Sequence, residues 1–324
     1  MTLAVLTPQL LHDSRLEAKL LRELGVVGPL LKEVGVEDVV LNPDNKLWCK
    51  RAGSPMAFHS MFSPAQASAL LATIAHICGH TLNEEHPVLE TVLPYDGSRI
   101  QGLIPPIVAA PSFAIRTRPT TVFTLADYVA AGILSASNRK AIEAAIAARK
   151  NILTVGGTGS GKTTLSNALL DSMAKLTPHH RVAIIEDTGE LKCEVANSIS
   201  LLASRSITMN DCLRSCMRLS PDRIIVGEVR GPESLELIKA WNTGHPGGVA
   251  TIHANSARGG LRRMERLVEE ATAAPKQEDI AEAVNMLIFI SKDLTVKAGR
   301  RVQEVLEVVG FDRDAMAYQC VEVP

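Results

Sequence analysis

Aromatic residues are scarce in this chain, since Phe, Trp and Tyr together make up 3% of its 324 residues. This scarcity argues against a surface that stacks successive bases of single-stranded nucleic acid. The formal net charge is -1 at pH 7, so the chain as a whole has no electrostatic attraction toward DNA or an acidic membrane. We therefore expect no direct sequence-specific binding of nucleic acid.

Long apolar runs and closely paired cysteines are also missing. No apolar run reaches the roughly 18 residues that a membrane-spanning helix needs, and the segment after Met1 lacks the pattern of a secretory leader. The six cysteines contain no C-x-x-C pair. We expect a cytoplasmic protein with free thiols.

The length and a hydrophobic content of 46% predict two globular domains. Residues 1–120 mix helical periodicity with short strands, which predicts an N-terminal α+β domain. Residues 121–137 are expected to form a linker that contains one short helix. From residue 138 to 324, apolar strands alternate with helices, which predicts an α/β domain with a mainly parallel sheet.

A complete phosphate loop, G-x-x-x-x-G-K-[ST], stands between an apolar run at 151–155 and a helical stretch at 164–173. Its glycines let backbone N–H groups converge on phosphate oxygens at the start of a helix. Lys162 is placed to reach the β- and γ-phosphates, and the Thr163 hydroxyl is a candidate Mg²⁺ ligand. The expected nucleotide-binding residues of this segment are Gly156, Gly157, Thr158, Gly159, Ser160, Gly161, Lys162, Thr163 and Thr164.

Acidic residues follow two further apolar strands. Glu186 and Asp187 end the run 182–185, where Glu186 could orient or deprotonate the attacking water and Asp187 could hold metal-bound water, if this strand neighbours the loop strand. Glu228 follows the run 223–226 and is a second candidate for the metal and the water. His253 follows a third strand, 248–252, and could sense the γ-phosphate.

In this order, the phosphate loop, IIEDTGEL, RIIVGEVRGPE and GHPGGVATIHANS resemble the Walker A, Asp box, Walker B and His box of the type II/type IV secretion ATPase superfamily. The likeness covers the second half of the chain and extends into the first, where Ile104-Pro105-Pro106 and Ala114-Ile115-Arg116 resemble family signatures. It implies a C-terminal RecA-like P-loop NTPase domain beside the smaller N-terminal domain. It also implies a homohexameric ring, bound to inner-membrane components of a secretion complex at the cytoplasmic face of that membrane.

The same resemblance implies site roles. Lys162 and Thr163 would serve ATP and Mg²⁺, Glu186 and Glu228 the water and metal, and His253 would sense the nucleotide. Arg116 is the first candidate to reach the nucleotide from the N-terminal domain, ahead of Arg118. Candidates for action across a subunit boundary are Arg205, Arg214 and Arg218, of which Arg214 fits an ion-paired helix face better.

Three readings of the function therefore stay open beside that of a conjugative ATP-hydrolysing motor. One is a nucleotide-dependent ring scaffold without significant turnover, which the presence of Glu186 and Glu228 disfavours. Another is a type II secretion or type IV pilus assembly ATPase, although the chain lacks the four-cysteine zinc motif of some pilus-retraction relatives, which favours the type IV secretion branch. The last is a small-molecule kinase, in which the His box and the first domain would have no place.

Overall fold

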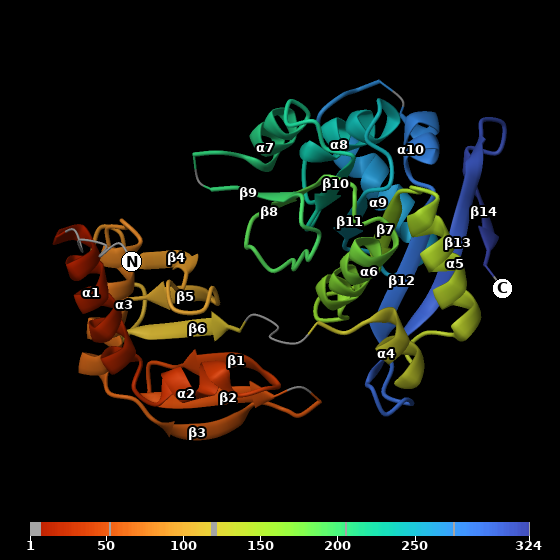
Figure 1. Ribbon diagram of the computed structural model, residues 1–324. Helices are drawn as coiled ribbons and strands as arrows, with labels where there is room; N and C mark the ends of the chain where they lie inside the picture. The colour runs from red at the N-terminus through yellow and green to blue at the C-terminus, as the bar shows by residue number, and fades with distance from the viewer. Residues whose placement is uncertain (1–7, 52, 118–121, 205, 275, 324) are drawn as a thin grey trace, which may run out of the picture. The chain divides into compact units, whose positions relative to one another are not determined.

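The computed structural model describes residues 8–51, 53–117, 122–204, 206–274 and 276–323. The chain divides into two compact units, Met1–Thr120 and Thr121–Pro324, and each builds its own hydrophobic core (Figure 1). Within the described ranges, no helix is both long enough and apolar enough to cross a bilayer.

The first unit is an antiparallel sheet with helices packed on it. Its elements, in chain order, are α1 (Pro8–Leu24), α2 (Val27–Lys32), β1 (Val36–Leu41), β2 (Lys46–Arg51), β3 (Ala57–Met61), α3 (Pro64–Ile77), β4 (Val88–Val92), β5 (Arg99–Leu103) and β6 (Ser112–Arg116). The strands pair in the order β3-β2-β1-β6-β5-β4, and α1 packs beside α3 (Figure 1). This arrangement is the α+β organisation that the sequence predicts.

Local sequence explains where α3 begins and how closely it packs. The Ser63 hydroxyl accepts a hydrogen bond from the Gln66 amide at 3.3 Å, and the Gln66 side-chain oxygen accepts one from the Ser63 amide at 3.2 Å. This reciprocal cap satisfies two amides that the first helical turn leaves free. A Cβ at Gly102 of β5 would lie 2.5 Å from Leu71 of α3, so glycine permits the helix to approach the sheet.

The second unit contains a larger sheet. Its elements are α4 (Leu125–Ala130), α5 (Ala136–Ala147), β7 (Ile152–Val155), α6 (Lys162–Leu176), β8 (Val182–Glu186), β9 (Ser198–Leu202), α7 (Met209–Cys216), β10 (Arg223–Val226), α8 (Glu233–Asn242), β11 (Val249–Ile252), α9 (Ala257–Glu269), α10 (Gln277–Ala283), β12 (Met286–Lys292), β13 (Arg300–Asp312) and β14 (Ala317–Glu322). The strand order is β14-β13-β12-β7-β11-β10-β8-β9. All neighbours from β12 to β9 are parallel, whereas β13 and β14 are added antiparallel.

The central strands are buried on both faces, which explains why they are nearly continuous apolar runs rather than alternating patterns. Successive side chains point to opposite faces and so enter two separate clusters. One cluster holds Leu153 and Ile224 and packs against α7, α8, α9 and α10. The other holds Ile152 and Ile225 and packs against α4, α5 and α6.

A buried arginine at the start of the central strand β10 bonds the segments around it. Arg223 is fully buried and donates to the carbonyls of Gly247 and Ile146, each at 2.8 Å, and to Nδ1 of His180 at 2.9 Å. Burial, followed by the charge of Arg149, lowers the pKa of Arg223 to about 10. Burial and then Arg223 also lower the pKa of His180, in keeping with a neutral ring that accepts the bond.

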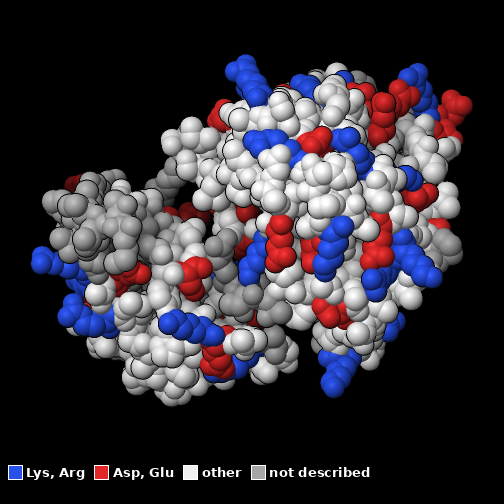
Figure 2. All heavy atoms as spheres, in the orientation of Figure 1, with Lys and Arg blue, Asp and Glu red and all other residues white. Residues whose placement is uncertain are grey.

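The structure also differs in places from the sequence-based expectations. Residues 121–137, expected as a linker, include α4, whose Leu125 and Tyr128 are buried in the second unit's core. β9, β12, β13 and β14 were not predicted; β9, β13 and β14 lack a continuous apolar run, whereas β12 has one, which sequence reasoning missed. In the view of Figure 2, basic and acidic side chains are interspersed over the second unit.

Candidate nucleotide site

The phosphate loop joins β7 to α6, as its motif predicts. Gly159 and Gly161 have φ values of +68° and +102°, in the left-handed region that glycine adopts without strain. A Cβ at Gly156 would lie 2.4 Å from the Ile290 carbonyl of β12, so the loop and its neighbouring strand approach closely only with glycine there. The loop therefore needs these glycines for its shape and for its packing.

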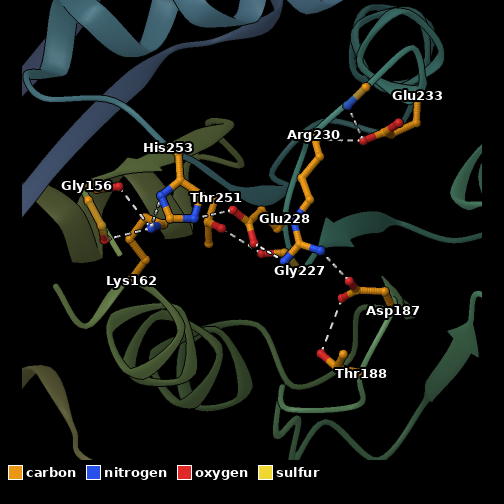
Figure 3. A network of polar contacts seen from close by, with 12 residues as sticks. Gly156, Lys162, Asp187, Thr188, Gly227, Glu228, Arg230, Glu233, Thr251 and His253 are labelled. Atoms are coloured by element: carbon orange, nitrogen blue, oxygen red, sulfur yellow. Dashed lines mark hydrogen bonds and ion pairs between the residues drawn. The ribbon is translucent and has the colours of Figure 1, made fainter. Parts of the chain in front are cut away.

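Lys162 opens α6 and is 8% exposed. Its Nζ donates to the carbonyls of Gly156 at 2.9 Å and Gly157 at 3.0 Å, and lies 3.2 Å from Nδ1 of His253 (Figure 3). Burial lowers the pKa of the Lys162 ammonium, and the nearby Glu228 carboxylate opposes this effect. The lysine is thus fixed at the mouth of the loop by three acceptors.

His253 connects this lysine to Glu228. Its Nε2 lies 2.6 Å from Oε1 of Glu228, while Nδ1 faces the Lys162 ammonium. An ammonium can only donate, so Nδ1 must accept, and the ring proton then lies on Nε2, the ring nitrogen nearest to Glu228. Burial lowers the pKa of His253 against the opposing influence of Glu228, which agrees with a neutral ring.

Arg230 holds the carboxylates of two neighbouring strands together. It donates to Oε2 of Glu228 at 2.5 Å and to Oδ2 of Asp187 at 2.6 Å (Figure 3). Its own backbone is fixed by Glu233, whose Oε1 accepts from the amides of Arg230 and Gly231 at 2.7 and 2.9 Å. A continuous chain of polar contacts consequently runs from the phosphate-loop lysine to the acids after β8.

Glu186 lies on a strand that does not neighbour the phosphate-loop strand. β8 and β7 are not neighbours, because β11 and β10 lie between them, so the condition for a direct approach to the loop strand is not met. Glu186 is 4% exposed, and its Oε2 accepts from the amides of Glu190 and Leu191 at 2.7 and 3.0 Å. A Cβ at Gly227 would lie 2.9 Å from that of Glu186, so this glycine makes room for it. The carboxylate shapes its own loop.

Asn167 of α6 links that loop to the phosphate-loop helix. Its Oδ1 accepts from the Lys192 amide at 2.8 Å and its Nδ2 donates to the Glu190 carbonyl at 3.3 Å. Sequence reasoning assigned no role to Asn167 or Arg230. Arg230 had one usable signal, its position two residues after the strand-terminal Glu228, whereas the partners of Asn167 are distant in sequence.

The remaining candidates have varied surroundings. Thr163 and Thr164 lie in the first turn of α6 and are partly exposed. Arg116 ends β6 in the first unit and is exposed. Arg214 lies 3.8 Å from Glu236 in an exposed ion pair, as expected for a helix face, and Arg218 is exposed after α7. Arg118 and Arg205 lie outside the described residues.

The donors suited to Mg²⁺ are oxygen atoms at the edge of the sheet where the parallel strands end. The Thr163 hydroxyl and the Glu228 carboxylate are of the chemistry that Mg²⁺ accepts while it keeps waters and phosphate oxygens as its other ligands. No group of three or more Asp, Glu, His or Cys side chains in the described parts of the chain forms an all-protein metal site. This finding fits a metal held jointly with phosphates. Asp187 and Glu228 each accept a hydrogen bond from Arg230, so Asp187 stays a candidate ligand beside Glu228.

A parallel sheet, a glycine loop at the end of a central strand and a helix that begins with its lysine are the features of the phosphate-loop class. Residues 36–320 match the model of the family described as type II/IV secretion system protein, and the chain belongs to this family. It is 42% identical to conjugal transfer protein TrbB of Rhizobium radiobacter over 304 residues, which cover 94% of this chain and 93% of that protein.

One further relative and one solved structure are also similar to this chain. The type IV secretion system protein VirB11 of Bartonella henselae is 28% identical over 302 residues, which cover 78% of this chain and 82% of that one. The crystal structure of the pilus retraction motor PilT with bound ADP aligns with a TM-score of 0.63 at 19% identity, over 93% of this chain and 83% of that one. The latter likeness concerns the fold.

Proposed function

We propose that this protein is an ATP-hydrolysing motor of a conjugative type IV secretion system, which powers pilus assembly and substrate transfer. The observation that best supports the proposal is the contact chain Lys162–His253–Glu228–Arg230, which joins the phosphate loop to a fixed carboxylate. A scaffold that only binds nucleotide has no need of such a carboxylate. The names of the TrbB and VirB11 relatives support the conjugative and secretion context.

In this mechanism the loop amides and Lys162 bind the β- and γ-phosphates and neutralise charge that develops during phosphoryl transfer. Glu228 accepts the proton of the attacking water, since it is held at the end of β10 by His253 and Arg230. Mg²⁺, held by Thr163 and by Glu228 through water, would supply charge neutralisation at the phosphate oxygens. Glu186 positions the loop after β8 rather than the water.

His253 couples occupancy of the phosphate loop to the carboxylate. Its Nδ1 faces the Lys162 ammonium, whose other partners are the carbonyls of Gly156 and Gly157. When Lys162 turns toward a γ-phosphate, the imidazole loses one of its two partners and is free to reorient with Glu228. This movement is the sensing step that the proposal assigns to His253.

The proposal further includes a homohexamer at the cytoplasmic face of the inner membrane, bound to membrane components of the secretion complex. Arg116 of the first unit would reach the nucleotide, and Arg218 would act across a subunit boundary. In this proposal both units would contact the nucleotide, so that turnover would change the angle between them. Native mass measurement with and without ATP tests the ring, and monomers under all conditions would contradict it.

The central test compares phosphate release by wild type, Glu228→Gln and Lys162→Ala. Glu228→Gln keeps the size of the side chain and should lower turnover by about 10²- to 10⁴-fold, the usual contribution of a general base, while ADP still binds. Lys162→Ala should lose both binding and turnover. Equal and low phosphate release by wild type and Glu228→Gln would instead favour the nucleotide-dependent scaffold.

A further inference from the structure

Two cations from the β12–β13 hairpin lie against the phosphate loop. Lys292 ends β12 and Arg300 begins β13, and the two residues pair directly across the antiparallel ladder. Nη1 of Arg300 lies 2.6 Å from the position that a Cβ of Gly161 would occupy. Nζ of Lys292 lies 3.6 Å from the corresponding position at Gly159. The hairpin thus brings two positive charges to the glycines of the loop.

Lys292 and Arg300 differ in their ion pairing from the arginine that follows Arg300 on β13. Arg301, the next residue along β13, forms an ion pair with Asp293 at 3.7 Å. Neither Lys292 nor Arg300 forms an ion pair with any acid in the part of the chain that the structure describes. Two cations beside the positive end of α6 repel each other and the helix dipole, so their placement is unfavourable unless an anion binds there.

The strand order places this pair opposite the catalytic carboxylate. β7, which leads into the loop, has β11 on one side and β12 on the other. His253 follows β11, and Glu228 follows β10 beyond it, whereas Lys292 ends β12. Water that attacks the γ-phosphate in line is activated from the Glu228 side. The part of the nucleotide that ADP and ATP share therefore lies toward the hairpin.

We propose that Arg300, assisted by Lys292, binds the diphosphate portion of the nucleotide from the side of the loop opposite to Glu228. This inference rests on the proposed function, because it needs a nucleotide in the loop. Contacts to phosphates present in both ADP and ATP strengthen the binding of both nucleotides equally. Arg300 is consequently a nucleotide-binding residue, and the loop glycines give its guanidinium the space to reach the phosphates.

Titration calorimetry with ADP and with a non-hydrolysed ATP analogue tests this assignment. Arg300→Ala should raise the dissociation constant about tenfold or more for both nucleotides, as expected for the loss of charge-assisted hydrogen bonds. Arg301→Ala is the matched control on the same strand and should bind as the wild type does. Arg300→Lys keeps the charge without the guanidinium fork and should fall between wild type and Arg300→Ala.

The thermal midpoint without nucleotide separates binding from a structural role. Arg300→Ala should leave that midpoint within a few degrees of wild type and reduce only the rise that ADP produces. Unchanged affinity in Arg300→Ala, or an affinity loss confined to the ATP analogue, would overturn the inference. If Arg300→Ala fails to fold, wild-type affinity in Arg300→Lys together with Lys292→Ala would overturn it equally. Should wild type and Lys162→Ala both fail to bind ADP, the proposed function itself is wrong.

Discussion

Replacement of Arg230 by Gln tests whether the link between Glu228 and Asp187 matters for turnover. The variant keeps a polar side chain but loses both ion pairs, at 2.5 and 2.6 Å. Glu228 then keeps His253 as its remaining described partner and gains rotational freedom. We expect kcat to fall while ADP affinity stays near that of wild type, because Arg230 is not among the residues that contact the loop.

The size of this effect follows from the exposure of the partners. Solvent-exposed ion pairs contribute about 0.2–1 kcal/mol each. Arg230 is 53% exposed, which keeps both pairs within this range, and the low exposure of Glu228, 15%, places its pair at the upper end. The sum is about 1–1.5 kcal/mol. If this energy is expressed in the transition state, kcat falls about five- to twelvefold.

Steady-state phosphate release at saturating ATP measures the change. Arg139→Gln is the matched control, since Arg139 is also an arginine at the surface paired with a carboxylate, that of Glu143, but has no assigned role in the site. Arg230→Lys should lie between wild type and Arg230→Gln. A kcat of Arg230→Gln within twofold of wild type would refute the view that Arg230 positions Glu228.

Three further predictions concern stability. Burial and then Arg223 lower the pKa of His180 in the folded protein; Arg149 and His179 add to this effect, and Asp222 opposes it. The unfolded chain therefore takes up a proton at His180 at about pH 6.5, where the folded protein does not. Stability should therefore fall as the pH is lowered from 7.5 to 5, and the slope of the urea midpoint against pH should be smaller in His180→Gln; an equal slope would contradict this role. Gly248→Ala would place a methyl group 2.2 Å from Nε1 of Trp241 and 2.3 Å from the Ile224 carbonyl, so we expect a loss of about 3 kcal/mol in urea unfolding, and a loss below 0.5 kcal/mol would argue against this packing. Asn167→Ala should cost about 2 kcal/mol and accelerate hydrogen exchange of the Lys192 amide, whereas unchanged exchange would show that the Asn167 bond does not hold that loop.

The sequence predicted individual residues of the site, but not the contacts between them. The phosphate loop and the strand-terminal Glu228 and His253 are recognisable because each follows an apolar run in a fixed pattern. The strand order cannot be read in this way, since the insertion of β11 and β10 between β7 and β8 depends on packing distant in sequence. For that reason the expectation of Glu186 near the loop depended on the two strands being neighbours, which they are not, and its carboxylate bonds the amides of residues 190 and 191.

The fold shows the same division. Continuous apolar runs predicted β7, β8, β10 and β11, whereas the equally apolar β12 was not predicted. β14 has only exposed and partly exposed residues, and the buried residues of β13 are irregularly spaced, so no short signal marks the two strands as additions to the parallel sheet. The cations at positions 292 and 300 lie in that unpredicted region, so their place beside the loop emerged only from the structure.

Helix α6 gives the site a mechanical property of its own. Lys162 and Asn167 are five residues apart on one helix, a separation of about 7.5 Å along its axis. The first touches the loop carbonyls and the second bonds the backbone at 190 and 192. A helix is stiff over such a distance, so we expect a shift of α6 along its axis at the phosphate end to move the loop after β8 as well. α6 thus couples the phosphate loop mechanically to the loop after β8.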